Sequence, residues 1–491
     1  MVSNHPERLN TDFTTGLLPS PLTHWSWQAT KRTLTGLVLT ATFIRLAFAF
    51  SRVSVPFELD YEEGNVLNAA LRILHGQTPY PDPASFPYTL NPYGPIGYAT
   101  AAIGTKLFGV SLFGPRLLVF VAGIATMAII ALLIAKLSDD WHVGVLFAGV
   151  FACSPLVKLW LPLLRVDFLA IFWSVLGLYI FLAKPRLWWI AAVAFSLAFL
   201  TKPTAIAAPL ACVLDLMLRK RVVAALGFSA TYLGIISASV FVFGKNFIFD
   251  LTRTHPDPYS LKRALALYFV ALISAQLVLG VLVYAIAFGF RWTNQSRALG
   301  FYFAASSLAA LSGGKLGSET NHFLEWTAAL CIVGGLATAF LLASHKPLAQ
   351  AFFIGLAALT IWFAVIPRYA LVSEASPGGC LEAYNFLRSF PGERILSEDV
   401  ASLVVSGKPV LVSNPFVVTQ LGDSVAWSRG SMSDLASRQY FDLIILGGEV
   451  HGFQPGSGRW PPAFISAVGQ HYHVQRRFLC SPHFVVAYAP K

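Results

Sequence analysis

The stretch Leu59-Asp60-Tyr61-Glu62-Glu63-Gly64 places three carboxylates within four residues, directly after the first long apolar run. A structural role is open to two of them, because an Asp followed three positions later by a Glu resembles a helix capping box. That role does not explain three carboxylates beside an apolar segment. A carboxylate held near a substrate can take a proton from a hydroxyl group. We therefore expect Asp60 to act as a base, with Glu62 a second catalytic candidate and Glu63 a substrate-binding one.

Basic side chains and one more acid stand at the ends of later apolar runs. Positive groups stabilise a phosphate that leaves during a transfer reaction, so Arg165, Lys202 and Lys315 are candidate phosphate contacts. Asp167 is a further candidate catalytic carboxylate. The alternative is that such charges simply extend toward water at a membrane edge, or that Arg165 and Asp167 pair with each other.

Three other positions could contact a substrate. Arg45 lies inside the first apolar run, where a charge costs about 2.5–3.5 kcal/mol on insertion scales, so it needs a partner or a phosphate. Asn321 and His322 precede a later apolar run. A hydrogen-bonded Asn–His pair would explain these two residues equally well.

The composition indicates what must position these side chains. Hydrophobic residues make up 56% of 491 positions and charged residues 12%, whereas soluble chains have about 45–50% and 25%. The apolar residues form blocks of about 20, the length that crosses a bilayer core of roughly 30 Å. The sequence therefore predicts a polytopic α-helical membrane protein. Residues 1–32 are polar, and the first apolar run is too long for a cleavable signal peptide.

About 11 spans are expected, at residues 33–54, 116–136, 144–162, 168–183, 187–201, 203–218, 222–243, 264–288, 298–313, 324–343 and 347–367. Basic residues between these spans gather on one side, which the positive-inside rule assigns to the cytoplasm. The net charge of +11 is explained by this pattern, and no basic cluster with interleaved aromatic residues indicates a nucleic-acid site.

This topology divides the chain into a cytoplasmic segment (1–32), a transmembrane domain (33–368) with a long first outer loop (55–115), and an outer domain (369–491). Apolar residues in the first outer loop follow helical spacing, which predicts an amphipathic helix along the membrane surface; they are Val66, Leu67, Ala70, Leu71 and Leu74. The outer loop 244–263 is basic, against the rule. Either it meets an anionic ligand or head group, or the span count is off by one nearby.

The C-terminal region has a globular composition. Strand-like runs at 394–396, 409–412 and 442–446 alternate with helix-like runs at 381–389, 431–439 and 461–470, which predicts a small α/β domain. Cys380 and Cys480 both fall in this region, on the oxidising side, and could either pair or remain free. The other cysteines lie in apolar runs, and no spacing suggests a zinc site.

Several motifs taken together resemble the GT-C superfamily of membrane glycosyltransferases, which includes protein O-mannosyltransferases and bacterial aminoarabinose transferases. The resemblance covers most of residues 33–340, and its motifs are 59–64, Asn91-Pro92-Tyr93-Gly94-Pro95, Lys106-Leu107-Phe108-Gly109, Leu164-Arg165-Val166-Asp167, Leu200-Thr201-Lys202-Pro203-Thr204 and 317–325. It implies that Asp60 is the catalytic base or orients the acceptor, that Asp167 is a secondary acid, and that Arg165 and Lys202 contact phosphate. His322 resembles a site position of the family.

Two departures from the family pattern affect these assignments. The chain has Asp-Tyr-Glu-Glu where O-mannosyltransferases have an Asp-Glu pair, which leaves open which acid takes the proton. It also lacks a basic residue before Asn91-Pro92, where aminoarabinose transferases place a phosphate-binding lysine. Lys202 or Arg165 would have to replace that lysine.

We therefore expect an inverting glycosyltransferase that moves a sugar from a polyprenyl-phosphate donor to an acceptor hydroxyl on a glycan, lipid or protein. It would lie in the cell (inner) membrane as a multi-pass protein, with a cytoplasmic N-terminus and a periplasmic or extracellular C-terminal domain. Asp60, Glu62 and Glu63 could bind a divalent cation, but no spacing demands a metal and no other cofactor is expected. The alternatives are a transporter or lipid-linked sugar flippase, which should show inverted repeats and midplane charges, and a non-catalytic scaffold that displays residues 369–491.

Overall fold

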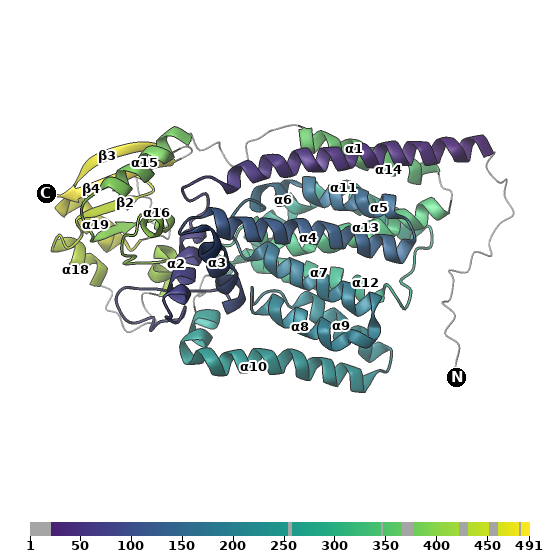
Figure 1. Cartoon of the computed structure of the whole chain (residues 1–491), viewed down its shortest axis with the longest axis horizontal. Helices are drawn as coiled ribbons and strands as arrows, with labels where there is room; N and C mark the ends of the chain where they lie inside the picture. The colour runs from purple at the N-terminus through teal and green to yellow at the C-terminus, as the bar shows by residue number, and fades with distance from the viewer. Residues whose placement is uncertain are drawn as a thin grey trace.

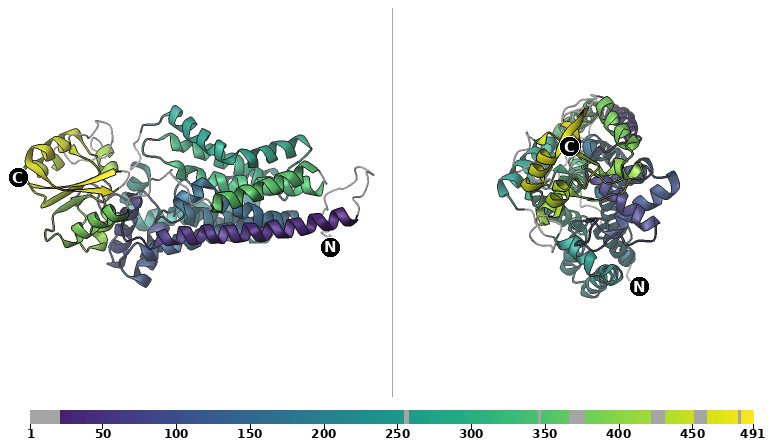
Figure 2. Two further views of the ribbon diagram at one scale, coloured as in Figure 1. Left: turned by 90° about the horizontal axis from the view of Figure 1, so that it is seen from above. Right: turned by 90° about the vertical axis from the view of Figure 1, so that its left-hand side faces the viewer.

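The computed structural model describes residues 21–253, 258–344, 347–365, 377–421, 431–450, 460–480 and 483–491. An elongated helical bundle carries a smaller α/β domain at one end, which we call the domain end (Figure 1). The first helix, α1 (Pro21–Val53), runs along the bundle toward this end. Seen from above, the sheet domain and the bundle stay distinct, and α1 lies along one edge of the bundle (Figure 2). Residues 1–20 of the predicted N-terminal segment lie outside the described residues.

Long apolar helices form the bundle. Six helices in the described part of the chain are long and apolar enough to cross a membrane: α1, α4 (Phe113–Ser138), α10 (Val222–Arg253), α11 (Leu261–Ala287), α13 (Leu324–Ala343) and α14 (Pro347–Val365). Shorter helices accompany them: α5 (Trp141–Cys153), α7 (Asp167–Ala183), α8 (Trp188–Phe199), α9 (Ala207–Leu218) and α12 (Arg297–Ala309). The prediction of a polytopic helical membrane protein is confirmed.

Two predicted spans differ from the helices that form. The span 144–162 is split into α5 and α6 (Pro155–Trp160), because Ser154 has an extended backbone and Pro155 has no N–H to continue the α5 ladder. The Ser154 hydroxyl instead caps α6 by accepting from the Val157 N–H. The span 222–243 continues as helix to Arg253 after an interruption at Gly244, whose φ of 72° suits glycine. Part of the predicted loop 244–263 is therefore helical.

The amphipathic stretch of the first outer loop forms α2 (Glu62–Leu74), as predicted. The prediction that the membrane surface covers its apolar face is corrected at three positions, because Val66, Leu67 and Ala70 are fully buried within the protein. α2 packs between α3 (Pro95–Phe108) and α16 (Val400–Val405) of the α/β domain. A Cβ atom on Gly64 would lie 2.3 Å from the Ala401 nitrogen, so this close approach of two helices requires glycine.

The C-terminal domain contains a four-stranded sheet in the order β1-β2-β4-β3. The strands are β1 (Ile395–Ser397), β2 (Leu443–Leu446), β3 (Tyr472–Cys480) and β4 (His483–Pro490). β1 and β2 are parallel, and the other pairs are antiparallel. The accompanying helices are α15 (Pro377–Ser389), α16, α17 (Pro415–Leu421), α18 (Ser431–Ser437) and α19 (Pro462–His471).

The strand predicted at 409–412 does not join this sheet. Its end pairs instead with the first outer loop: Tyr88 donates its N–H to the Leu411 carbonyl at 3.0 Å, and Ser413 donates to the Tyr88 carbonyl at 3.0 Å. The Leu90 N–H donates to the Ser413 hydroxyl at 3.1 Å. The run is apolar because it is buried between two domains, a setting that sequence alone does not distinguish from a sheet interior.

Cys380 and Cys480 are joined in a disulfide, so the first of the two alternatives for these cysteines is confirmed. The bond ties α15, which begins the C-terminal domain, to β3 at the edge of the sheet. Cys153, Cys212 and Cys331 are buried and free, as their apolar surroundings indicated.

Candidate active site

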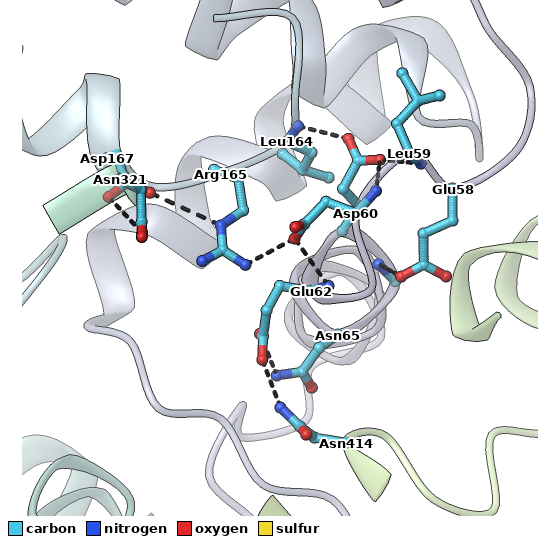
Figure 3. Close-up of polar contacts among 12 residues, drawn as sticks. Glu58, Leu59, Asp60, Glu62, Asn65, Leu164, Arg165, Asp167, Asn321 and Asn414 are labelled. Carbon is cyan, nitrogen blue, oxygen red and sulfur yellow. Dashed lines mark hydrogen bonds and ion pairs between the residues drawn. The ribbon is translucent and has the colours of Figure 1, made fainter. Parts of the chain in front are cut away.

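Asp60 and Arg165 form the centre of the site (Figure 3). Asp60 lies in the turn before α2, and Arg165 lies in the turn between α6 and α7. Arg165 donates from Nη1 to Asp60 Oδ1 at 2.7 Å, and the same oxygen accepts the Glu62 N–H at 3.2 Å. Only 8% of the Arg165 side chain and 16% of the Asp60 side chain are exposed. Asp60 therefore stabilises the start of α2 and also faces a cation, so its two predicted roles are compatible.

Asp167 gathers the second half of the cluster at the first residue of α7. Its Oδ1 accepts from Lys202 Nζ at 2.5 Å and from Asn321 Nδ2 at 3.1 Å. Its Oδ2 lies 3.8 Å from Arg165 Nε. Arg165 thus stands between two carboxylates, and the predicted site residues Asp60, Arg165, Asp167, Lys202 and Asn321 converge at the domain end of the bundle.

Two aromatic rings hold the Arg165 guanidinium. Its central carbon lies 5.4 Å from the centre of the Trp160 ring and 5.9 Å from that of Tyr93. Trp160 is itself anchored, because its indole N–H donates to the Thr320 hydroxyl at 3.0 Å. A guanidinium against aromatic faces gains cation–π attraction and stays partly shielded from water. The sequence motifs contain Tyr93 but gave no reason to connect it with Arg165.

Glu63 is held in a closed ion pair with Arg116 of α4. Arg116 donates from Nε to Oε1 at 2.7 Å and from Nη2 to Oε2 at 2.6 Å, and neither side chain is exposed. The Glu63 oxygens also accept the N–H groups of Leu164 at 2.6 Å and Leu59 at 2.7 Å. Every oxygen of Glu63 is therefore occupied by protein donors that connect α2, α4 and the turn before Arg165. This geometry suits a residue that positions the loop better than the predicted substrate contact.

Glu62 points toward the C-terminal domain and is held by two side-chain amides. Asn414 Nδ2 donates to Oε1 at 2.5 Å, and Asn65 Nδ2 lies 3.3 Å from Oε2. The Asn414 side chain is oriented by its Oδ1 atom, which accepts the Val417 N–H at the start of α17. The α/β domain thus supplies a residue that contacts the acidic motif, as Figure 3 shows.

A pocket opens beside Asp167 and Lys202. Polar groups from four segments of the chain line it, together with small and apolar side chains: Asp167, Ala170, Ile171, Lys202, Thr204, Ala205, Ala309, Ser312, Asn321, His322 and Glu325. Glu325 of α13 lies near the hydroxyl groups of Ser174 and Tyr302. Among the described residues, Glu325 Oε1, Ser174 Oγ and Tyr302 Oη are buried without a hydrogen-bond partner of good geometry. Glu325 was not among the predicted site residues, because one acid at the start of an apolar run resembles an ordinary helix start.

The remaining predicted residues take different places. His322 lines the pocket, and its Nδ1 lies 2.8 Å from the Ser312 hydroxyl. Lys315 lies in the turn between the short helices η2 (Ala310–Gly314) and η3 (Thr320–Phe323), and no contact in the described residues joins its ammonium group to Asp60 or Asp167. Arg45 is outside the cluster, and it donates to the Lys158 carbonyl at 3.4 Å.

The basic stretch 244–263 contacts the segment 314–318. Arg263 donates from Nη2 to the Ser318 carbonyl at 2.6 Å, and the Ser260 N–H donates to the Gly314 carbonyl at 2.9 Å. The stretch therefore packs against the turn that carries Lys315 and leads to His322. Residues 254–257 of the stretch lie outside the described residues.

Nothing in the described residues forms a preassembled metal site. No group of three or more His, Cys, Asp or Glu side chains in this part of the chain is arranged to hold an ion. Asp60 faces Arg165, and Glu63 faces Arg116. Glu62 faces the side-chain amides of Asn414 and Asn65.

Burial and charge separate the three acids of the motif. Burial raises the pKa of Asp60 above its ordinary value, although the neighbouring Arg165 opposes the shift. Burial also raises the pKa of Glu62, again against the field of Arg165. Burial would raise the pKa of Glu63 as well, but the charge and hydrogen bonds of Arg116 outweigh it and hold that pKa below its ordinary value. Asp60 and Glu62 can therefore accept a proton more readily than Glu63.

A fourth acid, Glu58, connects the bundle to the C-terminal domain. Its oxygens accept the N–H groups of Gly64 at 3.2 Å and Ala401 at 3.1 Å. Burial raises its pKa well above the ordinary value, and the charge of Asp399, which is within hydrogen-bond reach, raises it further. A proton on Glu58 therefore stabilises the contact between the two domains.

The sign of this effect gives a test. Because the folded pKa of Glu58 lies above the unfolded one, its stabilisation is complete below the unfolded pKa and is lost as pH rises through the folded pKa. The thermal unfolding midpoint should therefore fall as pH rises from the unfolded to the folded pKa of Glu58. The fall should be smaller in Glu58→Gln. Glu393→Gln, which changes an exposed acid of the C-terminal domain, is the control. Equal pH dependence in wild type and Glu58→Gln would contradict the assignment.

Comparison with known proteins supports the architecture. Residues 91–249 match the family model of dolichyl-phosphate-mannose-protein mannosyltransferases. The crystal structure of ArnT from Cupriavidus metallidurans bound to undecaprenyl phosphate superposes with a TM-score of 0.59 at 13% identity, covering 92% of this chain and 98% of that chain. The apo structure of the same protein gives a TM-score of 0.58 at 14% identity with the same coverage. No curated protein sequence matches the chain. The family model over residues 91–249 agrees with the predicted resemblance, and the chain shares the overall fold of ArnT.

Proposed function

We propose that the protein transfers a sugar from a polyprenyl-phosphate donor to an acceptor hydroxyl. The observation that carries this proposal is the placement of Arg165 between the carboxylates of Asp60 and Asp167, beside a pocket that Lys202 also lines. A base for the acceptor and cations for the leaving phosphate thus meet at one end of a membrane bundle. The family model and the undecaprenyl phosphate bound by ArnT support this donor class.

The donor would bind with its phosphate at Arg165 and Lys202. Both cations already lie against carboxylates, which holds their side chains in place before a ligand arrives. The donor phosphodiester carries one negative charge and gains a second as the sugar is transferred. The charge of Arg165 and Lys202 would stabilise this growing charge in a site mostly closed to water, where electrostatic interactions are stronger than in solution. The sugar would occupy the pocket, where Ser312, His322 and Glu325 offer hydrogen-bonding groups to its hydroxyls.

The reaction would proceed by direct displacement. Asp60 takes the proton from the acceptor hydroxyl as the acceptor oxygen bonds to the anomeric carbon. The bond between that carbon and the phosphate oxygen breaks, and its electron pair leaves with the phosphate. Attack opposite the leaving group inverts the anomeric configuration. The raised pKa of Asp60 favours this role, because a general base works best when its pKa approaches the working pH.

We further propose that the domain end faces the periplasm or the cell exterior. Lys136 in the last turn of α4 and the basic residues that follow α7 and α9 lie at the opposite end of these helices from the site, which fits a cytoplasmic position. The Cys380–Cys480 disulfide fits an oxidising compartment for the C-terminal domain. Membrane-impermeant labelling of a cysteine introduced at the exposed position Ser85 in intact cells tests this orientation.

The decisive assay uses the purified protein in nanodiscs with labelled polyprenyl-phosphate sugars and candidate acceptors. The expected result is release of polyprenyl phosphate together with a glycosylated acceptor of inverted anomeric configuration, read by NMR. Movement of lipid-linked sugar between leaflets without turnover would instead identify a flippase.

Asn414 provides a test of the contribution of the C-terminal domain. Asn414→Leu removes the donor to Glu62 Oε1 and should lower turnover about tenfold, because a hydrogen bond to a charged group contributes about 1.5–3 kcal/mol. A positioning role also predicts a shifted pH–rate profile, whereas a purely structural role predicts less folded enzyme with an unchanged profile. Gln470→Leu, an exposed amide of the same domain, should have no effect. An unchanged turnover and pH profile in Asn414→Leu would exclude Asn414 from the site.

A further inference from the structure

We propose that Glu325 selects the donor sugar. It accepts a hydrogen bond from a hydroxyl or amino group on the far side of the sugar ring, and it excludes a sugar that carries a carboxylate there. The far side is the one opposite the anomeric carbon, around C4 and C6 of a hexose. The inference rests on the proposed sugar transfer and adds a specificity-determining residue to it. The donor would then be a neutral or amino sugar and not a uronic acid.

The pocket beside Lys202 extends into the bundle along α7. Asp167, the first residue of α7, lines the pocket, and so does Ala170, which lies about one helical turn further along. Ser174 follows after one more turn, about 10 Å beyond Asp167 along the helix axis. Glu325 lines the same pocket and also lies near the Ser174 hydroxyl. The Glu325 carboxylate therefore stands at the inner end of the pocket, where the far side of a bound sugar would lie.

Two residues that line the pocket present acceptor oxygens without a partner. Among the described residues, Glu325 Oε1 and Asn321 Oδ1 are buried and lack a hydrogen-bond partner of good geometry. The Asn321 amide is oriented by Asp167, because its NH₂ group donates to that carboxylate at 3.1 Å and its oxygen must then point elsewhere. Carboxylate and amide oxygens accept hydrogen bonds, so a ligand that meets them must supply the donors. Hydroxyl and amino groups of a sugar are such donors.

The charges around Glu325 disfavour a second carboxylate. The Lys202 ammonium acts on Glu325, but it is already paired with Asp167 at 2.5 Å. The hydroxyl groups of Ser174 and Tyr302 lie near the Glu325 carboxylate, although neither residue lines the pocket, so they support Glu325 from behind. A sugar carboxylate placed against Glu325 would meet a like charge and would offer no donor in return.

A sugar that lacks the donor group should also be rejected. A deoxy sugar has nearly the same shape as its parent, but it would leave the buried Glu325 oxygen without a donor. A site that is built to form a hydrogen bond with a substrate discriminates strongly against the analogue that cannot form it. A hydrogen bond to a charged group corresponds to a preference of about 10- to 100-fold. The preference for parent over deoxy sugar therefore measures recognition by Glu325.

Competition between donors, with the full chain in nanodiscs, tests the proposal. Values of kcat/KM would be measured for polyprenyl-phosphate-linked mannose, glucose, galactose, arabinose and glucuronic acid, and the best neutral donor becomes the parent. Its 4-deoxy, 6-deoxy (for a hexose) and 4-amino analogues follow. We expect wild type to prefer the parent over at least one deoxy analogue by about 10- to 100-fold and to use glucuronic acid poorly. In Glu325→Leu the preference for the parent should largely disappear. A ratio of two kcat/KM values from one preparation does not depend on how much of the protein is folded.

Two variants complete the test. Glu325→Gln keeps the shape but removes the charge and adds an amide donor, so the use of glucuronic acid relative to the parent should rise about tenfold, a gain that misfolding cannot produce. Thr338→Val, on the same helix, changes a hydroxyl that donates to the Gly334 carbonyl within α13 and should leave every ratio unchanged. The 4-amino arm shows whether the pocket prefers a hydroxyl or an amino group.

The outcomes separate this inference from the function on which it rests. Equal ratios of parent to deoxy donor in wild type and Glu325→Leu would overturn the selection by Glu325, even if the parent is turned over. Efficient use of glucuronic acid by wild type would overturn it as well. Turnover of none of these donors would contradict the proposed function, and the inference would fall with it.

Discussion

Replacing Asp60 with asparagine should lower the rate of sugar transfer by about 10²–10⁴-fold, the usual contribution of a positioned general base. Asparagine has nearly the same shape and can still accept from Arg165 Nη1 and from the Glu62 N–H, which now meet Asp60 Oδ1. The site geometry should therefore persist while the ability to take a proton is lost. Turnover of a labelled donor by purified enzyme, with each variant at equal folded concentration, measures the effect.

Two controls make the Asp60 result specific. Polyprenyl phosphate should still bind to Asp60→Asn, because Arg165 and Lys202 remain and one opposing negative charge is removed. Asp82→Asn changes an exposed aspartate of the same outer loop, one that accepts the Ala84 N–H, and should keep full turnover. Full activity of Asp60→Asn in membranes would show that another acid takes the proton. Glu62 would then be the next candidate, since its pKa is also raised by burial.

Replacing Arg116 with methionine should lower the free energy of unfolding by about 3–5 kcal/mol, the range seen when one partner of a buried ion pair is removed. The loss is large because Glu63 would remain fully buried without its cation. The carbonyl groups of Val55 and Phe57 would also lose their donor, since Arg116 bonds both of them. Equilibrium unfolding in mixed micelles, followed by circular dichroism, gives the measurement.

A double-mutant cycle separates the pair from its surroundings. Glu63→Gln together with Arg116→Met should be less destabilising than the sum of the single changes, because no unpaired charge remains buried. Arg72→Met is the control for loss of a more exposed arginine and should change the unfolding free energy by less than about 0.5 kcal/mol. If the effects of the two single changes on the unfolding free energy simply add, the hydrogen bonds between Glu63 and Arg116 contribute no coupling energy.

The sequence predicted the main elements of the bundle because membrane helices leave a local signal. Runs of apolar residues with lengths matched to a bilayer do not depend on the rest of the fold. The helix between Glu62 and Leu74 was equally evident from its spacing. The cover of its apolar face was misjudged, however, because the spacing shows that one face is apolar without showing what packs against it. Here the cover is protein, namely α3 and α16.

The site residues also divide into those with a local signal in the sequence and those whose role depends on packing. Asp60, Arg165, Asp167 and Lys202 were recognisable because charged residues at the ends of apolar runs are conspicuous, and one end of the bundle does bring them together. The motifs did not reveal that Glu63 is locked by Arg116, since that bond joins α2 to a helix whose arginine resembles any other residue at a membrane edge.

The residues that sequence reasoning missed are those whose role depends on a distant neighbour. Asn414 matters because the α/β domain docks onto the acidic motif, and Glu325 because α13 turns it toward the pocket. By itself the sequence determined which segments enter the membrane and which charges lie at their ends, because both follow from local hydropathy and local charge. Only the tertiary structure decided which carboxylate meets which cation, because ion pairing requires contacts of a few ångströms that helix packing and domain docking create.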